Sequence, residues 1–378
     1  MRGIKFISLH EKSGYGVAGY RYLQGLINSG IPVTWTPMVK GDEWGMEYQP
    51  FRNSDPGITF FSTVCNIEIE YDLVIVHTVP EYFPEWKRIE GDKIVVGCTV
   101  WETDKLPLQW LDLLNSVDAL LVPCAWNKEV FQLHEIDPPV LIYPHICTNQ
   151  TLPENFNYPE IRDEEFVFYT INTWTERKAI SDTVKAYLRT FSYSDPVCLL
   201  IKTTEIDFTV SEFEKKVSDT ISEIISRFPQ PAKIILVTGD NLDDSQILNI
   251  HRRGDCYISL TRTEGWGMGA FDAATYEKPV IITGHGGHTD YLPKDLAYLV
   301  DYTLIPVEYH EKSFLYSRDQ KWAQPDLSHA VDLMREIFEN RKDLNDKKSK
   351  LKSFIVDKFN ETTVTNNLFK DLHRVLKY

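Results

Sequence analysis

The stretch TRTEGWGMGAFDAATYEKPVI, from Thr261 to Ile281, contains the most specific pattern in the sequence. Glu264 precedes a glycine-rich turn, a helical pattern that includes Asp272 follows the turn, and a strand-like run comes next. Glycines at the start of a helix expose backbone amides, and the helix dipole favours an anion there. Carboxylates accept hydrogen bonds from neutral hydroxyl groups. The stretch therefore predicts a site that binds a phosphate and a sugar beside Glu264.

Short apolar runs alternate with longer helical patterns on both sides of this stretch. This alternation is typical of parallel sheets with crossover helices, so the sequence predicts an α/β protein with two sheets. Strands are expected at 4–9, 32–37, 73–77, 94–100, 119–123 and 140–143 in the first half, and at 166–170, 197–203, 233–238, 255–259 and 279–283 in the second.

The length of 378 residues suggests two domains, because a domain usually holds about 100 to 200 residues. The segment 147–165 contains two prolines and a run of acidic residues without an apolar period, so we expect a linker there. The first Rossmann-like domain is expected over residues 1–150, joined by the C-terminal helix 358–378, and the second over residues 163–357.

The charge and the apolar runs limit the partners and the location. The 40 basic residues against 55 acidic ones give a net charge of −15, which argues against binding to nucleic acid or to an anionic membrane. No apolar run approaches the roughly 18 residues of a membrane span. The opening MRGIKFISL is too short for a secretory signal. A cytoplasmic protein without a transmembrane segment is therefore expected, with peripheral membrane contact left open.

Six cysteines lie far apart, without the spacing of a zinc site, so buried thiols and no metal site are expected. A metal site of another kind would need a DxD motif after a strand. The nearest candidate is the stretch Asp240–Asp243, whose spacing is wrong.

A second glycine-rich stretch, SGYGVAGY from Ser13 to Tyr20, follows the first expected strand. Gly14, Tyr15 and Gly16 could bring backbone amides to a phosphate at the start of a helix. With Gly19 the stretch also meets the GxGxxG pattern of dinucleotide-binding enzymes. No acidic residue ends the second strand, which weighs against a nicotinamide or flavin oxidoreductase.

Polar residues at the ends of first-half strands are candidates for an acceptor site. Thr99 and Glu102 follow the fourth expected strand, and His77 ends the third. Ligands of open parallel sheets bind at such strand ends. The structural alternatives are that Glu102 caps the helix near Pro107 with Lys105 as its partner, and that His77 is a buried structural residue.

Basic residues at strand ends of the second half could bind a diphosphate. Arg177 and Lys178 lie at the start of an expected helix, and Lys202 ends another strand. Basic charge at a helix start opposes the helix dipole, and an anionic ligand would explain it. The alternative is that Arg177 and Lys178 form an exposed pair at the helix start.

These residues resemble those of a known family, the retaining nucleotide-sugar glycosyltransferases of GT-B fold, family four. Glu264 and Asp272 resemble the E-x7-E motif of that family, with Asp in place of the second Glu. Lys178 in ERKAISDTVKAY and the stretch PVIITGHGGHTDYL also resemble family elements. The segments 101–107, 122–127 and 143–146 look like blocks of the N-terminal domain in one branch of the group.

The resemblance implies roles for individual residues. Glu264 would contact hydroxyls of the donor sugar, and Asp272, one methylene shorter than the family's Glu, would bind the ribose. Lys178, with Arg177 or Lys202, would hold the pyrophosphate. Backbone groups of two segments would contact the sugar and the phosphate. These segments are Gly267, Met268, Gly269 and Ala270 in the second domain and Gly14, Tyr15 and Gly16 in the first. Glu264, Glu102, Thr99 and His77 are the catalytic candidates, although family members often have a His where this chain has Thr99, Trp101 and Glu102.

The activity implied is transfer of a hexose from a nucleoside-diphosphate sugar, such as UDP-glucose, to a saccharide or glycoconjugate hydroxyl. The anomeric configuration would be retained, with no metal or cofactor, because fixed cations and amides would stabilise the leaving diphosphate. Two other functions stay open: a non-catalytic subunit that binds a sugar nucleotide, and the dinucleotide-dependent oxidoreductase.

Overall fold

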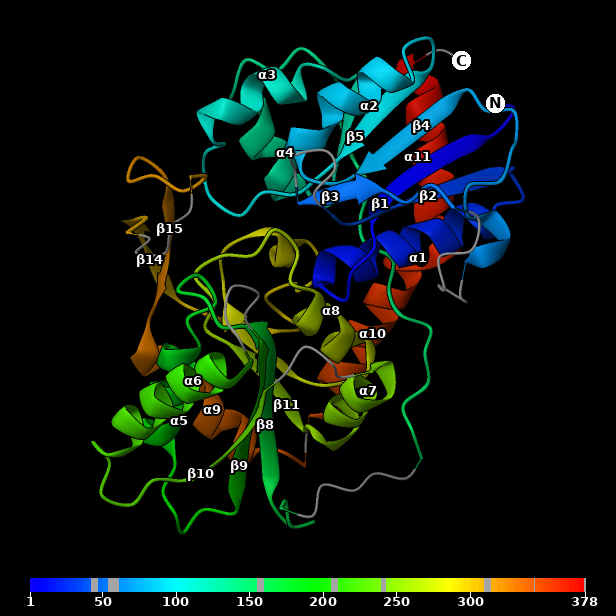
Figure 1. The fold of residues 1–378 in the computed structure, drawn as a ribbon. Helices are drawn as coiled ribbons and strands as arrows, with labels where there is room; N and C mark the ends of the chain where they lie inside the picture. The colour runs from blue at the N-terminus through cyan, green and yellow to red at the C-terminus, as the bar shows by residue number, and fades with distance from the viewer. Residues whose placement is uncertain are drawn as a thin grey trace. The chain divides into compact units, whose positions relative to one another are not determined.

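The computed structural model describes residues 1–41, 47–53, 61–154, 160–204, 210–238, 243–308, 314–342 and 344–376. The chain divides into two compact units. Unit 1 comprises Met1–Cys147 with Asp357–Tyr378, and unit 2 comprises Thr148–Val356. Each unit contains its own mainly parallel sheet with helices on its faces, which confirms the predicted α/β class (Figure 1).

Unit 1 is built on a sheet of seven strands in the order β3-β2-β1-β4-β5-β6-β7. Its central strands are buried on both faces, so they are almost continuously apolar rather than alternating. All neighbouring strands are parallel except β3, which pairs antiparallel with β2 at the edge. The strands are β1 (Ile4–Leu9), β2 (Val33–Lys40), β3 (Tyr48–Pro50), β4 (Leu73–His77), β5 (Ile94–Cys98), β6 (Ala119–Val122) and β7 (Val140–Ile142).

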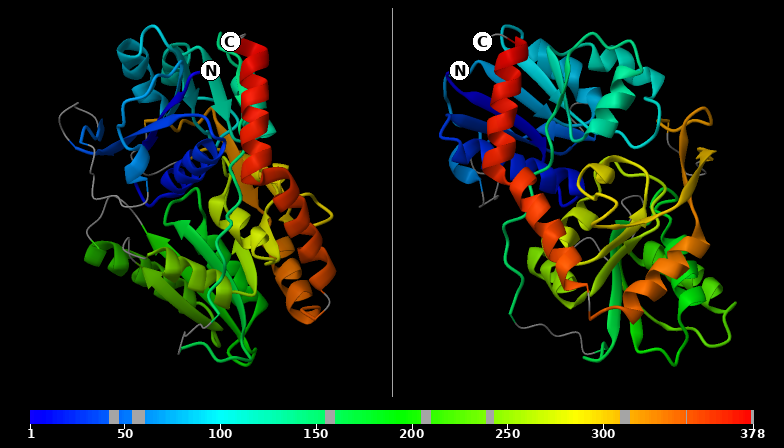
Figure 2. Two further views of the ribbon diagram at one scale, coloured as in Figure 1. Left: turned by 90° about the vertical axis from the view of Figure 1, so that its right-hand side faces the viewer. Right: turned by 180° about the vertical axis from the view of Figure 1, so that it is seen from behind.

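The helices of unit 1 include the end of the chain. They are α1 (Gly14–Asn28), α2 (Phe83–Ile89), α3 (Leu111–Leu114), α4 (Ala125–Gln132) and α11 (Glu361–Leu376). Helix α11 packs against α1 (Figure 2), and the Asn28 amide donates to Glu361 at 2.7 Å. A Cβ on Gly25 would lie 2.7 Å from Thr365 Oγ1, so the glycine allows the two helices to approach closely.

Unit 2 is built on six parallel strands in the order β10-β9-β8-β11-β12-β13. The strands are β8 (Phe166–Thr173), β9 (Val197–Thr204), β10 (Lys233–Thr238), β11 (Cys256–Ser259), β12 (Val280–Thr283) and β13 (Tyr298–Val300). The helices are α5 (Ile180–Thr190), α6 (Val210–Ile225), α7 (Asp244–Arg253), α8 (Met268–Thr275), α9 (Leu327–Glu339) and α10 (Asn345–Phe359), the last of which continues into unit 1. Helices α5, α6 and α9 cover one face of the sheet, and α7 and α8 lie on the other (Figure 1).

A two-stranded antiparallel hairpin leaves unit 2 after β13. It consists of β14 (Tyr302–Pro306) and β15 (Lys321–Pro325), and its ends meet where the Asp326 amide donates to the Asp301 carbonyl at 2.8 Å. The sequence analysis predicted neither this hairpin nor the short strands β3 and β13. The three-residue strands are too short to show a period of two, and β14 is exposed along nearly all of its length, so it has no buried face to produce an alternating pattern.

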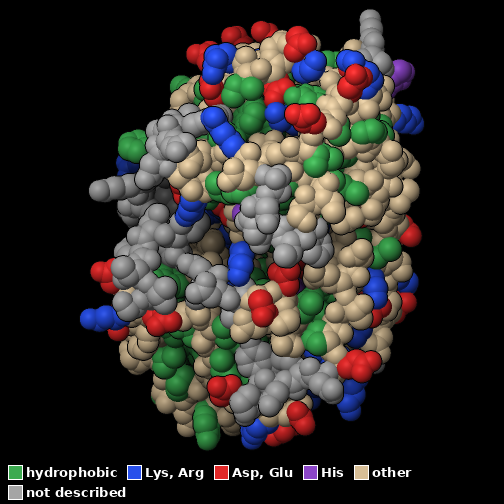
Figure 3. Space-filling view, turned by 45° about the vertical axis from the view of Figure 1, so that its right-hand side comes forward, with side chains coloured by type: hydrophobic (Ala, Val, Ile, Leu, Met, Phe, Trp, Pro, Cys, Tyr) green, Lys and Arg blue, Asp and Glu red, His purple; other side chains and the backbone are tan. Residues whose placement is uncertain are grey.

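Several expectations about composition can be compared with the structure. All six cysteines are free thiols, and five are buried, with Cys147 partly exposed. Acidic and basic side chains are interspersed on the face drawn in Figure 3. None of the helices in the described ranges is long and apolar enough to cross a membrane.

Candidate functional site

The site in unit 2 is formed by two loops at the carboxyl ends of neighbouring strands. Strand β8 leads into the turn 174–179 before α5, and β11 leads into the loop 260–267 before α8. Because β8 and β11 pair in parallel, both loops leave the same edge of the sheet. The Arg262 amide donates to the Arg177 carbonyl at 2.7 Å and joins the loops. Residues more than 80 positions apart are thereby brought together.

Glu264 is paired with both basic residues of the turn. Lys178 Nζ lies 2.7 Å from each carboxylate oxygen, and Arg177 Nη1 lies 3.5 Å from Oε2. The Arg177 guanidinium also donates to the Thr263 carbonyl at 3.1 Å. The exposed fractions of the three side chains are only 15% for Arg177, 13% for Lys178 and 5% for Glu264. The alternative of an exposed basic pair at the start of α5 is therefore wrong.

The charges keep Glu264 ionised. Burial by itself would raise the pKa of Glu264, but the charges of Lys178 and Arg177 outweigh burial and lower the pKa below its ordinary value. Two cations face one carboxylate, so the cluster has one positive charge in excess. The sequence analysis invoked an anionic ligand to explain the basic charge at the start of α5. Glu264 itself supplies one negative charge there, and the remaining positive charge can still bind an added anion.

The start of α8 adds backbone amides next to Glu264. Gly267, which precedes α8, has a φ of +88° and provides no side-chain cap. Side chains cap other helices, such as those of Ser13 in α1, Cys124 in α4, Asp243 in α7 and Asp326 in α9. At α8 the first amides belong to Met268, Gly269 and Ala270, so an external anion can take the place of a cap.

Close packing fixes the position of α8. A Cβ on Gly269 would lie 2.7 Å from Tyr257 Oη and 2.9 Å from the Ile171 carbonyl oxygen, so only glycine fits over β8 and β11. The Tyr291 hydroxyl donates to the Gly267 carbonyl at 2.8 Å. Asp272 lies one turn into α8 and is partly buried. The amides and Asp272 thus lie on α8, and Glu264 lies in the loop directly before it.

Two other candidates differ from expectation in their placement. Lys202 lies inside β9, paired with Ile171 and Val237, because the strand continues to Thr204. Of the stretch considered as a DxD motif, Asp240–Leu242 lies outside the described residues. Asp243 accepts the Gln246 amide at 2.9 Å as the cap of α7.

The glycine-rich start of α1 in unit 1 is already capped. Ser13 Oγ accepts the amides of Tyr15 and Gly16 at 3.1 and 3.2 Å. A Cβ on Gly16 would lie 2.0 Å from the Glu11 carbonyl oxygen. Gly16 therefore serves close packing in this structure. The expectation that the amides of Tyr15 and Gly16 are available to a phosphate is wrong, and only Gly14 is exposed.

Thr99 and His77 lie below Tyr15 in unit 1. The Tyr15 hydroxyl lies 2.8 Å from the Thr78 carbonyl oxygen, to which it donates, and 3.2 Å from Thr99 Oγ1. The Tyr15 ring stacks on His77 at 4.4 Å. Thr99 and His77 are each 2% exposed. His77 is therefore buried, as the structural alternative expected, and it stacks on Tyr15.

Glu102 does not cap the helix near Pro107. The short helix η3 (Leu108–Trp110) has Pro107 as its N-cap, without a side-chain hydrogen bond. The capping alternative for Glu102 is therefore wrong. The neighbouring Trp101 is a core residue whose indole donates to the Lys105 carbonyl at 2.7 Å. Glu102 is partly buried at the carboxyl end of β5.

Proteins similar to this chain were found among solved structures and not by comparison of sequences. No protein-family model matches the sequence, and no curated protein matches it. Sucrose-phosphate synthase from Thermosynechococcus elongatus matches with a TM-score of 0.69 at 11% identity, covering 100% of both chains. A glycosyltransferase from Rickettsia africae matches with a TM-score of 0.68 at 13% identity, covering 99% of this chain and 98% of the other. The chain has the GT-B fold.

One further match with this fold is a longer protein. TarM from S. aureus, a mutant in complex with fondaparinux, alpha-GlcNAc-glycerol and UDP, matches with a TM-score of 0.57 at 12% identity. The match covers 79% of this chain and 54% of TarM, so this chain spans about half the length of that protein. At these identities the likeness establishes the GT-B fold.

The loop Gly284–Gly287, to which the sequence analysis assigned no role, supports Glu264. The Gly287 amide donates to the Glu264 carbonyl at 2.7 Å. Gly286 has a φ of +117°, and a Cβ there would lie 2.7 Å from the Glu264 carbonyl oxygen and 2.9 Å from its nitrogen. His288 is fully buried, and its Nε2 donates to the Thr283 carbonyl at 2.6 Å. The signal available in the sequence was the run Gly284–Gly287 directly after a strand.

The buried histidines of unit 1 predict acid sensitivity. Burial lowers the pKa of His77 to about 3 and lowers the pKa of His145 as well. Below the ordinary pKa of about 6.5 the unfolded chain binds protons that the folded chain does not, so stability falls as the pH falls. We expect each histidine to lower the free energy of unfolding by about 1 kcal/mol between pH 7.0 and 5.5.

Denaturant unfolding at both pH values tests this expectation. His77→Phe keeps a ring in the stack and should reduce the pH dependence, whereas the control His373→Gln, at an exposed position, should leave it unchanged. An unchanged pH dependence in His77→Phe would contradict the assignment.

Proposed function

We propose that the protein is a retaining glycosyltransferase that transfers a hexose from a nucleoside-diphosphate sugar to a hydroxyl of a saccharide or glycoconjugate. The single observation that carries the proposal is the cluster in which Arg177, Lys178 and the uncapped start of α8 surround the buried Glu264. UDP-glucose is the first donor to test. Solved proteins of this fold include complexes with UDP and with UDP-2-fluoro glucose, which supports this choice.

The donor diphosphate is the group that fits the positive part of the site. Its oxygens would accept hydrogen bonds from the α8 amides and from Arg177 and Lys178. Lys178 would exchange one contact with Glu264 for a phosphate oxygen, since a diphosphate carries more charge than one carboxylate. Glu264 would then accept hydrogen bonds from sugar hydroxyls, and Asp272 would do the same for the ribose.

The reaction needs no enzymic nucleophile. The acceptor oxygen forms a bond to the anomeric carbon on the face that the leaving diphosphate vacates, and the bond from that carbon to the phosphate oxygen breaks. The acceptor proton passes to the leaving phosphate oxygen. Fixed cations and amides stabilise the charge that develops on the diphosphate, so we propose that no metal or cofactor is required.

On the acceptor side the proposal assigns Glu102 as a contact for the acceptor hydroxyl. Thr99 and His77 are assigned positioning roles through Tyr15, because both are buried beneath it. We propose a cytoplasmic location for this chemistry.

Donor binding and donor turnover test the proposal together. UDP should raise the melting temperature more than GDP or ADP does, because a ligand that binds only the folded state stabilises it. UDP-glucose without acceptor should be hydrolysed slowly, and proton NMR should detect the α-anomer of glucose first. A β-anomer as first product would contradict retention, and UDP binding without hydrolysis or transfer would identify a non-catalytic subunit.

A further inference from the structure

The hairpin of β14 and β15, which projects from the sheet of unit 2, has one exposed strand (Figure 1). Trp322 and Ala323 in the middle of β15 are buried, whereas every residue of β14 except the partly buried Ile305 is exposed. The exposed fractions are 39% for Tyr302 and 47% for Leu304. An exposed strand at the edge of a sheet is a template for pairing with another strand.

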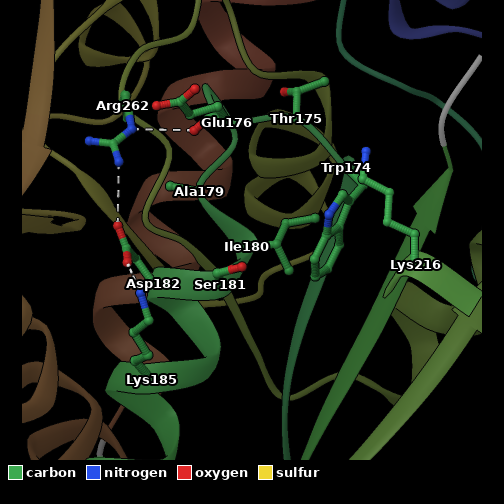
Figure 4. Close-up of a pocket in the computed structure, with 10 residues that line it drawn as sticks. All are labelled: Trp174, Thr175, Glu176, Ala179, Ile180, Ser181, Asp182, Lys185, Lys216 and Arg262. Atoms are coloured by element: carbon green, nitrogen blue, oxygen red, sulfur yellow. Dashed lines mark hydrogen bonds and ion pairs between the residues drawn. The ribbon is translucent and has the colours of Figure 1, made fainter. Parts of the chain in front are cut away.

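Arg262 holds the outer edge of β15 against unit 2. Its carbonyl accepts the Ala323 amide at 2.9 Å, and its guanidinium lies 5.3 Å from the centre of the Trp322 ring. The guanidinium also donates to the Glu176 carbonyl at 3.3 Å and lies 3.8 Å from the Asp182 carboxylate (Figure 4). The edge of β15 is therefore covered, and β14 is the strand whose outer edge is open.

The register of the hairpin decides which backbone groups of β14 point outward. The Val307 amide donates to the Gln320 carbonyl at 2.9 Å, so these residues form a hydrogen-bonded pair. Such pairs alternate along an antiparallel ladder, so Tyr302, Leu304 and Pro306 direct their backbone groups away from β15. Within the described part of the chain, these outward groups form no hydrogen bond. All three residues offer a C=O acceptor, and all but the proline offer an N–H donor.

The open edge is complementary to a second copy of itself. When two β14 strands pair antiparallel in full register, Leu304 lies opposite its counterpart and Tyr302 lies opposite Pro306. The two Leu304 residues then donate to each other, and each Tyr302 amide donates to a Pro306 carbonyl. The three side chains lie on one face of the strand, so they also pack across the pair. A two-stranded hairpin is marginally stable alone, and this pairing doubles its number of strands.

The distribution of charge also favours a second copy at this edge. The chain has a net charge of −15, so two copies repel each other on average. The stretch YTLIPV, residues 302–307, contains no charged side chain, so pairing there brings no like charges together. Strand edges are commonly protected from pairing by lysine or other charged side chains, and β14 lacks this protection.

We propose that two copies of this chain associate through β14, in antiparallel pairing with Leu304 at the twofold axis. The interface is isologous, because the same strand edge contributes both halves. Backbone hydrogen bonds join the two hairpins, and the side chains of Tyr302, Leu304 and Pro306 pack against their counterparts. This inference goes beyond the proposed function and does not depend on it.

Sedimentation equilibrium on the full chain between about 1 and 100 µM tests the proposal. The wild type should dimerise reversibly in this range, since an interface of this small size gives weak association. Leu304→Lys should weaken the dimer at least about tenfold, because it places two like charges opposite each other and removes an apolar contact. Leu133→Lys, the same substitution at a position that is 75% exposed in unit 1, should dimerise as the wild type does.

The charge-reversed variant Leu304→Glu tests the twofold pairing itself. Alone it should be as monomeric as Leu304→Lys, whereas an equimolar mixture of the two variants should form a heterodimer, because opposite charges then face each other. In the wild type, hydrogen exchange at the amides of Tyr302 and Leu304 should slow as the protein concentration rises, which tests the edge without a substitution.

Four results would overturn the proposal. They are a wild type that stays monomeric at about 100 µM, a dimer unchanged by Leu304→Lys, an equal loss in Leu133→Lys, and a mixture of folded position-304 variants that does not associate.

Discussion

Replacing Lys178 with methionine is expected to lower the free energy of unfolding by about 3 kcal/mol and to abolish transfer. The variant leaves the carboxylate of Glu264, which is 5% exposed, without its two hydrogen bonds of 2.7 Å. Breaking a buried ion pair on one side costs about 3 to 5 kcal/mol, and Arg177 at 3.5 Å keeps the loss near the lower end. Denaturant unfolding measures the first effect and a donor-turnover assay the second.

The double variant Lys178→Met/Glu264→Gln separates stability from function. A neutral glutamine side chain at position 264 needs no counter-charge, so most of the lost stability should return, whereas transfer should stay absent because the cation and the carboxylate are both gone. Lys185→Met is the matched control, since its pair with Asp182 is 37% exposed on the lysine side and should change stability by less than about 1 kcal/mol. A double variant that transfers as the wild type does would contradict the role of the pair.

Replacing Gly286 with alanine is expected to cost about 3 kcal/mol and to weaken donor binding together with stability. At a φ of +117° and a ψ of −170° the backbone lies in a region that is essentially restricted to glycine. The added Cβ would also lie within 2.9 Å of the Glu264 backbone, so Glu264 would have to move. Unfolding measurements and UDP titration of the variant report the two effects.

Gly30→Ala provides the control for backbone conformation alone. Gly30 also has a positive φ, of +79°, but a Cβ there meets no atom within 4 Å. Its cost should be about 1 kcal/mol, without an effect on UDP binding. Equal costs at both positions would show that contact with Glu264 contributes nothing.

The sequence was sufficient for most strands of the two large sheets, because these strands are rich in apolar residues. The expected ranges of β1, β4 and β10 agree with the structure at both ends, and of these three strands only β4 is buried along its whole length. The carboxyl ends of β8 and β11 could be placed together for the same reason, because neighbouring parallel strands end at one edge. The resemblance implied that Arg177, Lys178 and Glu264 contact one donor, and in the structure these strand ends bring the three side chains together.

The contacts inside the site could not be predicted, because each depends on tertiary packing. A pattern of glycines does not distinguish the start of α1, where Ser13 caps the amides, from the start of α8, which has no side-chain cap. In the same way, basic residues before a helix do not reveal that Glu264 will neutralise one of them. The fit of Gly286 against Glu264 depends on a loop whose conformation the sequence pattern does not specify.

Titration of UDP into the wild type and into Lys178→Met/Glu264→Gln tests the central claim most directly, because the double variant is expected to be folded and stable. The account predicts that UDP binds the wild type and that the double variant binds it at least about tenfold more weakly, since one charge-assisted contact to phosphate is lost. Equal affinities in the two proteins would contradict the assignment of this cluster as the diphosphate site.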